Sequence, residues 1–235
     1  SLWALLADYV PLVFAEELGA LDTSDLRPLD DHDPITERCR LLAQVLGVRE
    51  FRCALTDRRA LLGIALPGPP DWIVVGRSFR TQATAAELRF VMGRALAEVR
   101  TRSVTLTVLP PRRIELLLAC AVELFEKGFA DSLARPEEVA DVTRLLSRKL
   151  PRKVRKQLEE VATQYAAGQP VATATWQVAA KRSAERVGLL LAGDVAAALK
   201  VLVAEGASRA VQADLLRFSV GPHLHEAKRH VGLAI

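Results

Sequence analysis

The segment Thr84–Val99, TAAELRFVMGRALAEV, predicts a long amphipathic helix and is the most informative stretch of this chain. Its first residues form a Thr-x-x-Glu pattern, the signature of a capping box that satisfies free backbone N–H groups where a helix begins. Apolar side chains then recur every three or four residues, which places them on one face of a helix. We therefore expect one buried stripe, formed by Leu88, Val91, Met92, Ala95, Leu96 and Val99.

Short apolar runs on both sides of this helix predict a small sheet. Glu50–Leu55 and Trp72–Val75 are rich in residues that favour strands. Leu61–Leu66 is a third candidate, because it lies just before a Pro-Gly-Pro-Pro turn. Val104–Leu109 follows the helix and is expected to form one more short strand.

Helix signals dominate the remaining sequence. Ile35–Leu46 is amphipathic and is followed by Gly47, a residue suited to the left-handed conformation that ends many helices. Prolines and acidic residues mark helix starts in the second half of the chain. The expected fold is therefore α+β and predominantly helical, with a small sheet. Further helices are expected at Pro111–Lys127, from Pro136, from Pro151 to Gly168, at Thr173–Leu191, at Val195–Glu205 and in two short segments after Ser208.

The N-terminal region is expected to be separate from the main domain. Leu2–Phe14 is apolar, but it lacks a preceding basic region and is interrupted by an aspartate and a proline, so it predicts a packed helix. The acidic, turn-rich Asp22–Pro34 predicts a linker. We expect an N-terminal helix and linker at residues 1–34 and one domain at residues 35–235.

Composition limits the possible classes of protein. Half of the 235 residues are hydrophobic, enough for a large core, and Lys plus Arg exceed Asp plus Glu only slightly, 32 against 28. No run reaches the ~18 apolar residues of a membrane span, which favours a soluble protein. Cys39, Cys53 and Cys120 have no CxxC spacing, so neither a zinc cluster nor a disulfide framework is indicated and a cytoplasmic location is expected. Because Met92 is the only methionine, we expect the chain to be part of a longer protein.

The order of these segments resembles one family, the HtpX-like and CAAX-prenyl-protease-type zinc metallopeptidases in their soluble form. The resemblance runs from about Arg38 to about Ala204. Trp72-Ile73-Val74-Val75-Gly76 is followed by Ala86-Glu87-Leu88, at the start of the helix that carries His-Glu-x-x-His in the family. Downstream, KRSAERVGLLL corresponds to the family's Glu-x-x-Ala-Asp segment, which supplies the third zinc ligand. The matching residues there are Ala184, Arg186, Gly188 and Leu189.

The residues that would carry the family's chemistry are replaced in this chain. Zinc needs imidazole, thiolate or carboxylate donors that converge at about 2 Å, and cations and a methyl group cannot supply them. The resemblance therefore implies a zincin-like pseudoenzyme without zinc, without another cofactor and without peptidase activity. Arg94 and Glu98 occupy the two histidine positions, Ala95 that of the general base, Lys181 that of the third ligand and Glu185 that of the aspartate.

Two interpretations of these charges remain open. If the helices pack as in the family, Arg94, Glu98, Lys181 and Glu185 converge where zinc would lie and form a salt-bridge cluster in its place. Alternatively, Arg94 with Glu98 and Lys181 with Glu185 are i,i+4 pairs on exposed helix faces, each worth about 0.2–0.5 kcal/mol.

A basic segment lies at residues 144–156, where seven cations and no acidic residue occur in thirteen positions. Such a segment can contact phosphates or an acidic protein surface. No aromatic residue is interleaved for stacking on bases, so a solvated basic face is the preferred interpretation over a nucleic-acid site. The seven cations are Arg144, Arg148, Lys149, Arg152, Lys153, Arg155 and Lys156.

Protein binding is the function that these observations favour. We expect a non-catalytic interaction or scaffolding module of a larger protein, with a protein partner. The candidate contact surfaces are the basic segment and the sheet edge near Trp72 and Val74, where an extended partner would add as a strand. Binding of nucleic acid or another anionic surface through residues 144–156 is the alternative.

Overall fold

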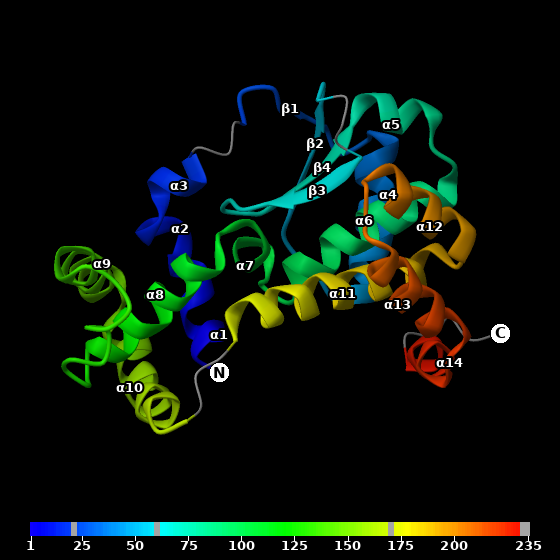
Figure 1. Cartoon of the computed structure of the whole chain (residues 1–235). Coiled ribbons are helices and arrows are strands. Elements are labelled where there is room, and N and C mark those ends of the chain that lie inside the picture. Colours follow the sequence, from blue (N-terminus) through cyan, green and yellow to red (C-terminus); the bar gives the residue numbers. More distant parts are fainter. Residues whose placement is uncertain (20–22, 59–61, 169–171, 231–235) are drawn as a thin grey trace. The chain divides into compact units, whose positions relative to one another are not determined.

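The computed structural model describes residues 1–19, 23–58, 62–168 and 172–230, and it confirms an α+β, mostly helical fold with a small sheet (Figure 1). The chain forms two compact units. The helical unit contains residues 1–21 and 105–178, and the sheet unit contains residues 22–104 and 179–235. This division differs from the expected boundary between residues 34 and 35.

Packing of the N-terminal segment explains that difference. The ring of Trp3 meets the ring of Trp176 edge-on at 5.4 Å, and the Arg113 guanidinium lies 4.6 Å from the Phe14 ring. A short helix cannot bury its apolar side chains alone, so this segment joins the core of the helical unit. The elements of this unit are α1 (Leu2–Leu6), η1 (Ala7–Tyr9), α2 (Val10–Val13), α3 (Ala15–Gly19), α8 (Pro111–Glu123), α9 (Pro136–Lys149) and α10 (Arg152–Ala166).

The sheet unit is built on four strands in the order β1-β2-β4-β3. β2 and β4 are parallel, whereas β1 and β3 pair with them in antiparallel fashion. The strands are β1 (Arg27–Pro28), β2 (Arg52–Thr56), β3 (Gly63–Leu66) and β4 (Trp72–Gly76). The helices are α4 (Pro34–Leu46), α5 (Arg77–Gln82), α6 (Ala85–Arg100), α12 (Val195–Ala204), α13 (Arg209–Val220) and α14 (Pro222–His230).

The strand predictions at Glu50–Leu55, Leu61–Leu66 and Trp72–Val75 are confirmed, apart from Leu61, which lies outside the described residues. The prediction that Trp72–Val75 forms a sheet edge is wrong. β4 lies between β2 and β3, and Val74 is fully buried, so the edge on this side is β3. Strand order depends on pairing between distant segments, which an apolar run does not reveal.

The expected acidic linker, whose first residue Asp22 lies outside the described residues, contributes to the sheet. β1 lies inside this segment, where Arg27 pairs with Leu55 and Pro28 with Ala54. The segment is therefore an edge of the sheet unit and not a free connection.

Helix α6 lies at the centre of the sheet unit, and its capping box is formed as predicted. Glu87 N donates to Thr84 Oγ1 at 3.2 Å and Thr84 N donates to Glu87 Oε2 at 2.7 Å. One face of the helix packs with α4 and the sheet, through residues such as Met92. Phe90 and Val91 pack in a second cluster with residues of α12 and α13. The helix is thus buried on two sides and not along one stripe.

The prediction of a strand at Val104–Leu109 is wrong, because this segment forms α7 (Val104–Val108). β-branched residues favour strands only where a neighbouring strand is available. Here Gln177 Nε2 instead donates to the Leu106 and Leu109 carbonyl oxygens, at 2.6 and 2.7 Å, and satisfies the end of the helix. Gln177 belongs to α11 (Thr173–Ala192), which begins in the helical unit and ends in the sheet unit.

Candidate functional site

The site begins with a close crossing of α6 and α11 in the sheet unit. Gly93 and Gly188 face each other there, and a Cβ atom on Gly188 would lie only 2.7 Å from the Phe90 carbonyl oxygen. A Cβ on Gly93 would lie 3.3 Å from the Cα of Gly188. The two backbones therefore touch, which fixes the neighbouring turns of both helices relative to each other.

Next to this crossing is a pocket of about 390 Å³. The residues that line it come from α6, α11, strand β3 and the turn that follows α12. All five positions that the sequence assigned to a degenerate zinc site contribute to this one pocket: Arg94, Ala95, Glu98, Lys181 and Glu185.

Arg94 does not pair with the acidic residues that the sequence offered. Its Nη1 and Nη2 atoms each donate to a carboxylate oxygen of Glu205 at 2.6 Å, and Nη2 also donates to the Gly63 carbonyl oxygen at 3.1 Å. The Arg94 side chain is 14% exposed. Burial alone would lower its pKa, but the Glu205 carboxylate outweighs this effect, so the pKa of Arg94 is raised. A bidentate pair of this kind holds both side chains in a fixed geometry.

Glu98 is the uncompensated group of the pocket. It is 9% exposed, and no hydrogen bond reaches its carboxylate from any part of the chain that the structure describes. Burial, together with the nearby carboxylates of Glu185 and Glu205, raises its pKa to about 7, although Arg94 and Lys181 oppose this shift. A carboxyl group that is largely, though not completely, removed from water resists ionisation in this way.

Glu185, the acidic residue that α11 contributes to the pocket, has a pKa shifted in the same direction as that of Glu98. Burial raises the pKa of Glu185, and its negatively charged neighbours Glu205 and Asp214 act in the same direction against Arg94. Lys181 is exposed and forms no ion pair within the described ranges. The two i,i+4 salt bridges that the sequence offered as an alternative are therefore not formed.

The chemistry of this pocket differs from that of a zinc site. An arginine already bound to a carboxylate, a methyl group and an exposed lysine provide no converging set of metal donors. Among the residues with described positions, no group of three or more His, Cys, Asp or Glu side chains is arranged to hold a metal ion.

The outer edge of β3 forms one wall of the pocket and is largely covered, since Ala65 is only 1% exposed. Gly76 N donates to the Leu62 carbonyl oxygen, so even-numbered residues of this strand bond to β4. The backbone groups of Gly63 and Ala65 therefore point away from the sheet. Arg94 occupies the Gly63 carbonyl, whereas the N–H and C=O of Ala65 have no partner within the described residues.

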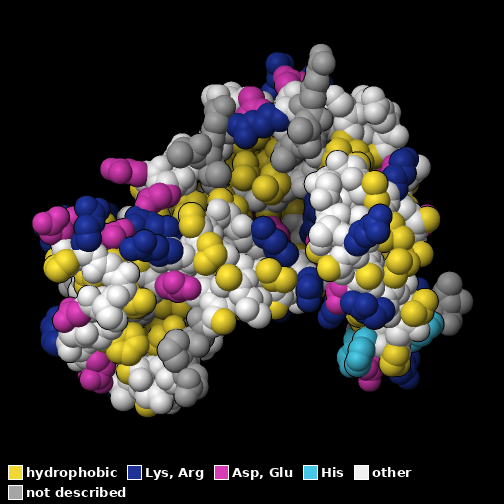
Figure 2. All heavy atoms as spheres, viewed as in Figure 1, with side chains coloured by type: hydrophobic (Ala, Val, Ile, Leu, Met, Phe, Trp, Pro, Cys, Tyr) yellow, Lys and Arg dark blue, Asp and Glu magenta, His cyan; other side chains and the backbone are white. Residues whose placement is uncertain are grey.

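The basic segment lies elsewhere, in the helical unit, at the turn between α9 and α10. Two of its seven cations are engaged within the chain: Arg144 pairs with Asp141 at 2.7 Å, and Arg155 donates to both oxygens of Ser147. On the face shown in Figure 2, Lys and Arg side chains lie interspersed with Asp and Glu. The other five cations are exposed and form no ion pair in the described part of the chain: Arg148, Lys149, Arg152, Lys153 and Lys156.

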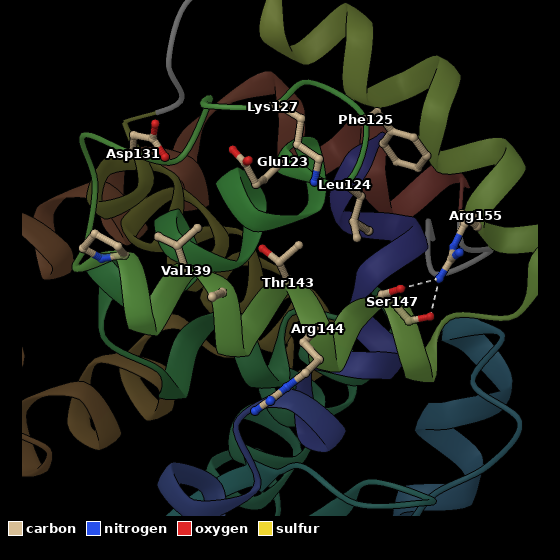
Figure 3. A pocket seen from close by; sticks show the side chains of 12 residues that line it. Glu123, Leu124, Phe125, Lys127, Asp131, Val139, Thr143, Arg144, Ser147 and Arg155 are labelled. Carbon is tan, nitrogen blue, oxygen red and sulfur yellow. Dashed lines mark hydrogen bonds between the residues drawn. The ribbon is translucent and has the colours of Figure 1, made fainter.

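A pocket of about 540 Å³ lies next to that segment, between α8, α9 and α10 (Figure 3). Its buried acid is Glu123, whose carboxylate accepts from the backbone N–H groups of Gly128 and Ala130 at 3.0 and 3.1 Å. Burial would raise the pKa of Glu123, but these hydrogen bonds lower it below the usual value. The carboxylate of Glu123 therefore binds the backbone of the loop that follows α8. The helix ends at Glu123, four residues earlier than predicted.

Sequence reasoning found the pocket but missed Glu205 as the partner of Arg94. Glu205 lies 111 residues away at the end of α12, and no local pattern marks it. No helix in the described residues is long and apolar enough to cross a membrane. Comparisons with protein-family models, with curated proteins and with solved structures found no match to this chain.

Proposed function

We propose that the sheet unit is a non-catalytic, metallopeptidase-like domain that binds an extended segment of a partner protein along the edge of β3. The observation that carries this proposal is the outer edge of β3, where the backbone of Ala65 has no partner in the described residues and lies beside a pocket lined by the degenerate positions. Ala65 is only 1% exposed, so an added strand has to displace the side chains that cover this edge. Strand addition uses such free backbone groups for affinity and a neighbouring pocket for specificity. The domain acts as an interaction or scaffolding module in the cytoplasm, a location supported by three unpaired cysteines.

The proposal of a pseudoenzyme is supported by the state of the charged groups. Metal-assisted hydrolysis needs a bound metal and an activated water. In this pocket the guanidinium of Arg94 is bound to Glu205, and Ala95 offers no base. The pKa of Glu98 is raised to about 7, but among the described residues no group of metal-ligating side chains is arranged beside it.

The proposal is tested with a library of blocked octapeptides passed over the immobilised protein, followed by mass spectrometry of the retained material. We expect intact peptides to be retained. Ala65→Pro should abolish retention, because proline removes the outward N–H. Since Ala65 is only 1% exposed, circular dichroism must show that the variant remains folded before its retention is compared. Ala65→Gly, which keeps the N–H, is the matched control. Cleaved peptides, or equal retention by Ala65→Pro, would contradict the proposal.

Proline at Val74, in contrast, does not test the edge. Val74 lies in a strand that is paired on both sides, so its replacement by proline removes a bond of the sheet. We expect Val74→Pro to unfold the sheet unit.

A second candidate function, binding of a nucleic acid or another anionic surface, is favoured by the five exposed cations between α9 and α10. If they bind phosphates, affinity for a nucleic-acid duplex falls steeply with salt concentration. Combined replacement of Arg152, Lys153 and Lys156 by Glu should then abolish binding. Failure of the unaltered protein to bind a duplex at low salt would eliminate this candidate.

A further inference from the structure

The pocket beside β3 contains more negative than positive groups. Its lining includes three carboxylates, Glu98, Glu185 and Glu205, and two cations, Arg94 and Lys181. Both terminal nitrogens of Arg94 already donate hydrogen bonds to the carboxylate of Glu205. Two carboxylates thus remain for one lysine, and that lysine is exposed and forms no ion pair in the described ranges.

The negative charge that remains without a cation lies inside the pocket, at Glu98, and not on the protein surface. The residue is 9% exposed, it lines the cavity, and its carboxylate has no hydrogen-bonding partner among the described residues. A buried carboxylate without a partner is costly, and its energy falls when a cation donates to it. The carboxylates present do not form a group that could hold a metal ion. An organic cation is the chemistry that remains.

The position of the pocket tells where such a cation would come from. Gly63, Ile64 and Ala65 of β3 line the same cavity as Glu98. In a strand, successive side chains point to opposite faces. A peptide strand added to β3 therefore directs every second side chain to the side on which α6 lies, where Ala65 packs with that helix.

We infer that this pocket binds the side chain of a lysine or arginine in the extended segment that adds to β3, with Glu98 and Glu185 as its acceptors. The inference rests on the proposed function, because strand addition brings the cation to the pocket. A basic side chain satisfies the buried carboxylate, and a neutral one leaves it unpaired. The site therefore selects the sequence of its partner by charge.

Three peptides that carry fluorescein on the N-terminal amine test this inference in fluorescence anisotropy at pH 8: Thr-Val-Thr-Lys-Thr-Val-Thr-amide and the same peptide with Gln or Glu in place of Lys. Blocked ends remove the terminal charges. We expect the Lys peptide to bind about tenfold more tightly than the Gln peptide, the factor given by one charge-assisted hydrogen bond, and the Glu peptide to bind most weakly.

Glu98→Gln should remove the preference for lysine while leaving affinity for the Gln peptide unchanged. Glu226→Gln, which deletes an exposed acidic charge on α14, is the matched control and should keep the preference. Should Glu98→Gln fail to fold, Glu185→Gln provides the same comparison and is expected to weaken the preference.

The outcomes separate the two proposals. If all three peptides bind with equal affinity and Ala65→Pro abolishes their binding, strand addition stands and the cationic pocket is overturned. If no peptide binds, strand addition itself is wrong, and the cationic pocket falls with it.

Discussion

Glu98 in the sheet unit and Glu123 in the helical unit each expose only 9% of their surface, yet the pKa values of their carboxyl groups are shifted in opposite directions. The pKa of Glu98 is raised to about 7, and that of Glu123 is lowered. Two backbone N–H groups bind the carboxylate of Glu123, and no N–H group of the described residues binds that of Glu98. The difference teaches that burial of an acid does not mark a functional site. A raised pKa in a pocket is the feature that makes Glu98 a candidate.

Glu98→Gln should have the largest effect on stability. The folded state holds the Glu98 proton more tightly than the unfolded state, so this group's contribution is full below its ordinary pKa of 4.5 and is lost as the pH rises through about 7. A tenfold change in proton affinity corresponds to about 1.4 kcal/mol, so glutamine should raise the free energy of unfolding at pH 8 by on the order of 3 kcal/mol.

Urea unfolding of the protein and of Glu98→Gln at pH 4.5 and pH 8 measures this effect. The two curves should nearly coincide at the lower pH. The facing charges, Arg94, Lys181, Glu185 and Glu205, are present in both proteins, so the difference reports the charge of Glu98 together with its coupling to these groups. A variant that is less stable at pH 8 would show that the carboxylate of Glu98 is paired after all.

Glu123→Ala, in contrast, should lower the free energy of unfolding. It leaves the N–H groups of Gly128 and Ala130 without their acceptor, and hydrogen bonds to a charged group are worth about 1.5–3 kcal/mol. We expect a loss of that order in the free energy of unfolding at pH 7. An unchanged free energy would remove the contrast between the two acids.

Gly188→Ala should sharpen the comparison, because it disturbs the pocket of Glu98 without changing any charge. The new Cβ would overlap the Phe90 carbonyl oxygen, and overpacking of this kind costs about 1–3 kcal/mol. Thermal unfolding measures this loss. Gly19→Ala, where the added atom meets nothing within 4 Å, is the control and should not lower the midpoint.

The cysteines give the smallest expected effect, because the pKa values of two buried thiols are shifted in opposite directions. Contact with Cys39 lowers the pKa of Cys53, whereas burial raises that of Cys120 to about 11. Since the thiolate is the reactive form, iodoacetamide at pH 8 should label Cys53 before Cys120. Peptide mapping of partially labelled protein gives the order, and earlier labelling of Cys120 would contradict it.

Local signals in the sequence predicted much of this fold. The capping box at Thr84, the apolar spacing of α6 and the left-handed Gly47 are properties of neighbouring residues, so they are visible in a single chain. The convergence of Arg94, Glu98, Lys181 and Glu185 was predicted because two separate segments resemble the two motifs of one peptidase family.

The errors concern contacts between distant segments. Gln177 holds residues 104–108 in a helix although their β-branched side chains favour a strand. The interior place of β4 follows from its pairing with both β2 and β3. Arg94 binds Glu205 and not the acidic residues that are nearer to it in sequence. These contacts depend on tertiary packing, which sequence spacing does not contain.

The most direct test of the unpartnered carboxylate at the β3 pocket is an NMR titration of the glutamate side-chain carboxyl carbons, assigned with Glu98→Gln and Glu123→Gln. We expect Glu98 to titrate near pH 7 and Glu123 below 4.5, in keeping with burial without a partner and burial with two N–H donors. Addition of the Lys peptide should lower the midpoint of Glu98, and the Gln peptide should not. A midpoint for Glu98 at or below 4.5 in the free protein would contradict the claim, because the chain itself would then already neutralise this carboxylate.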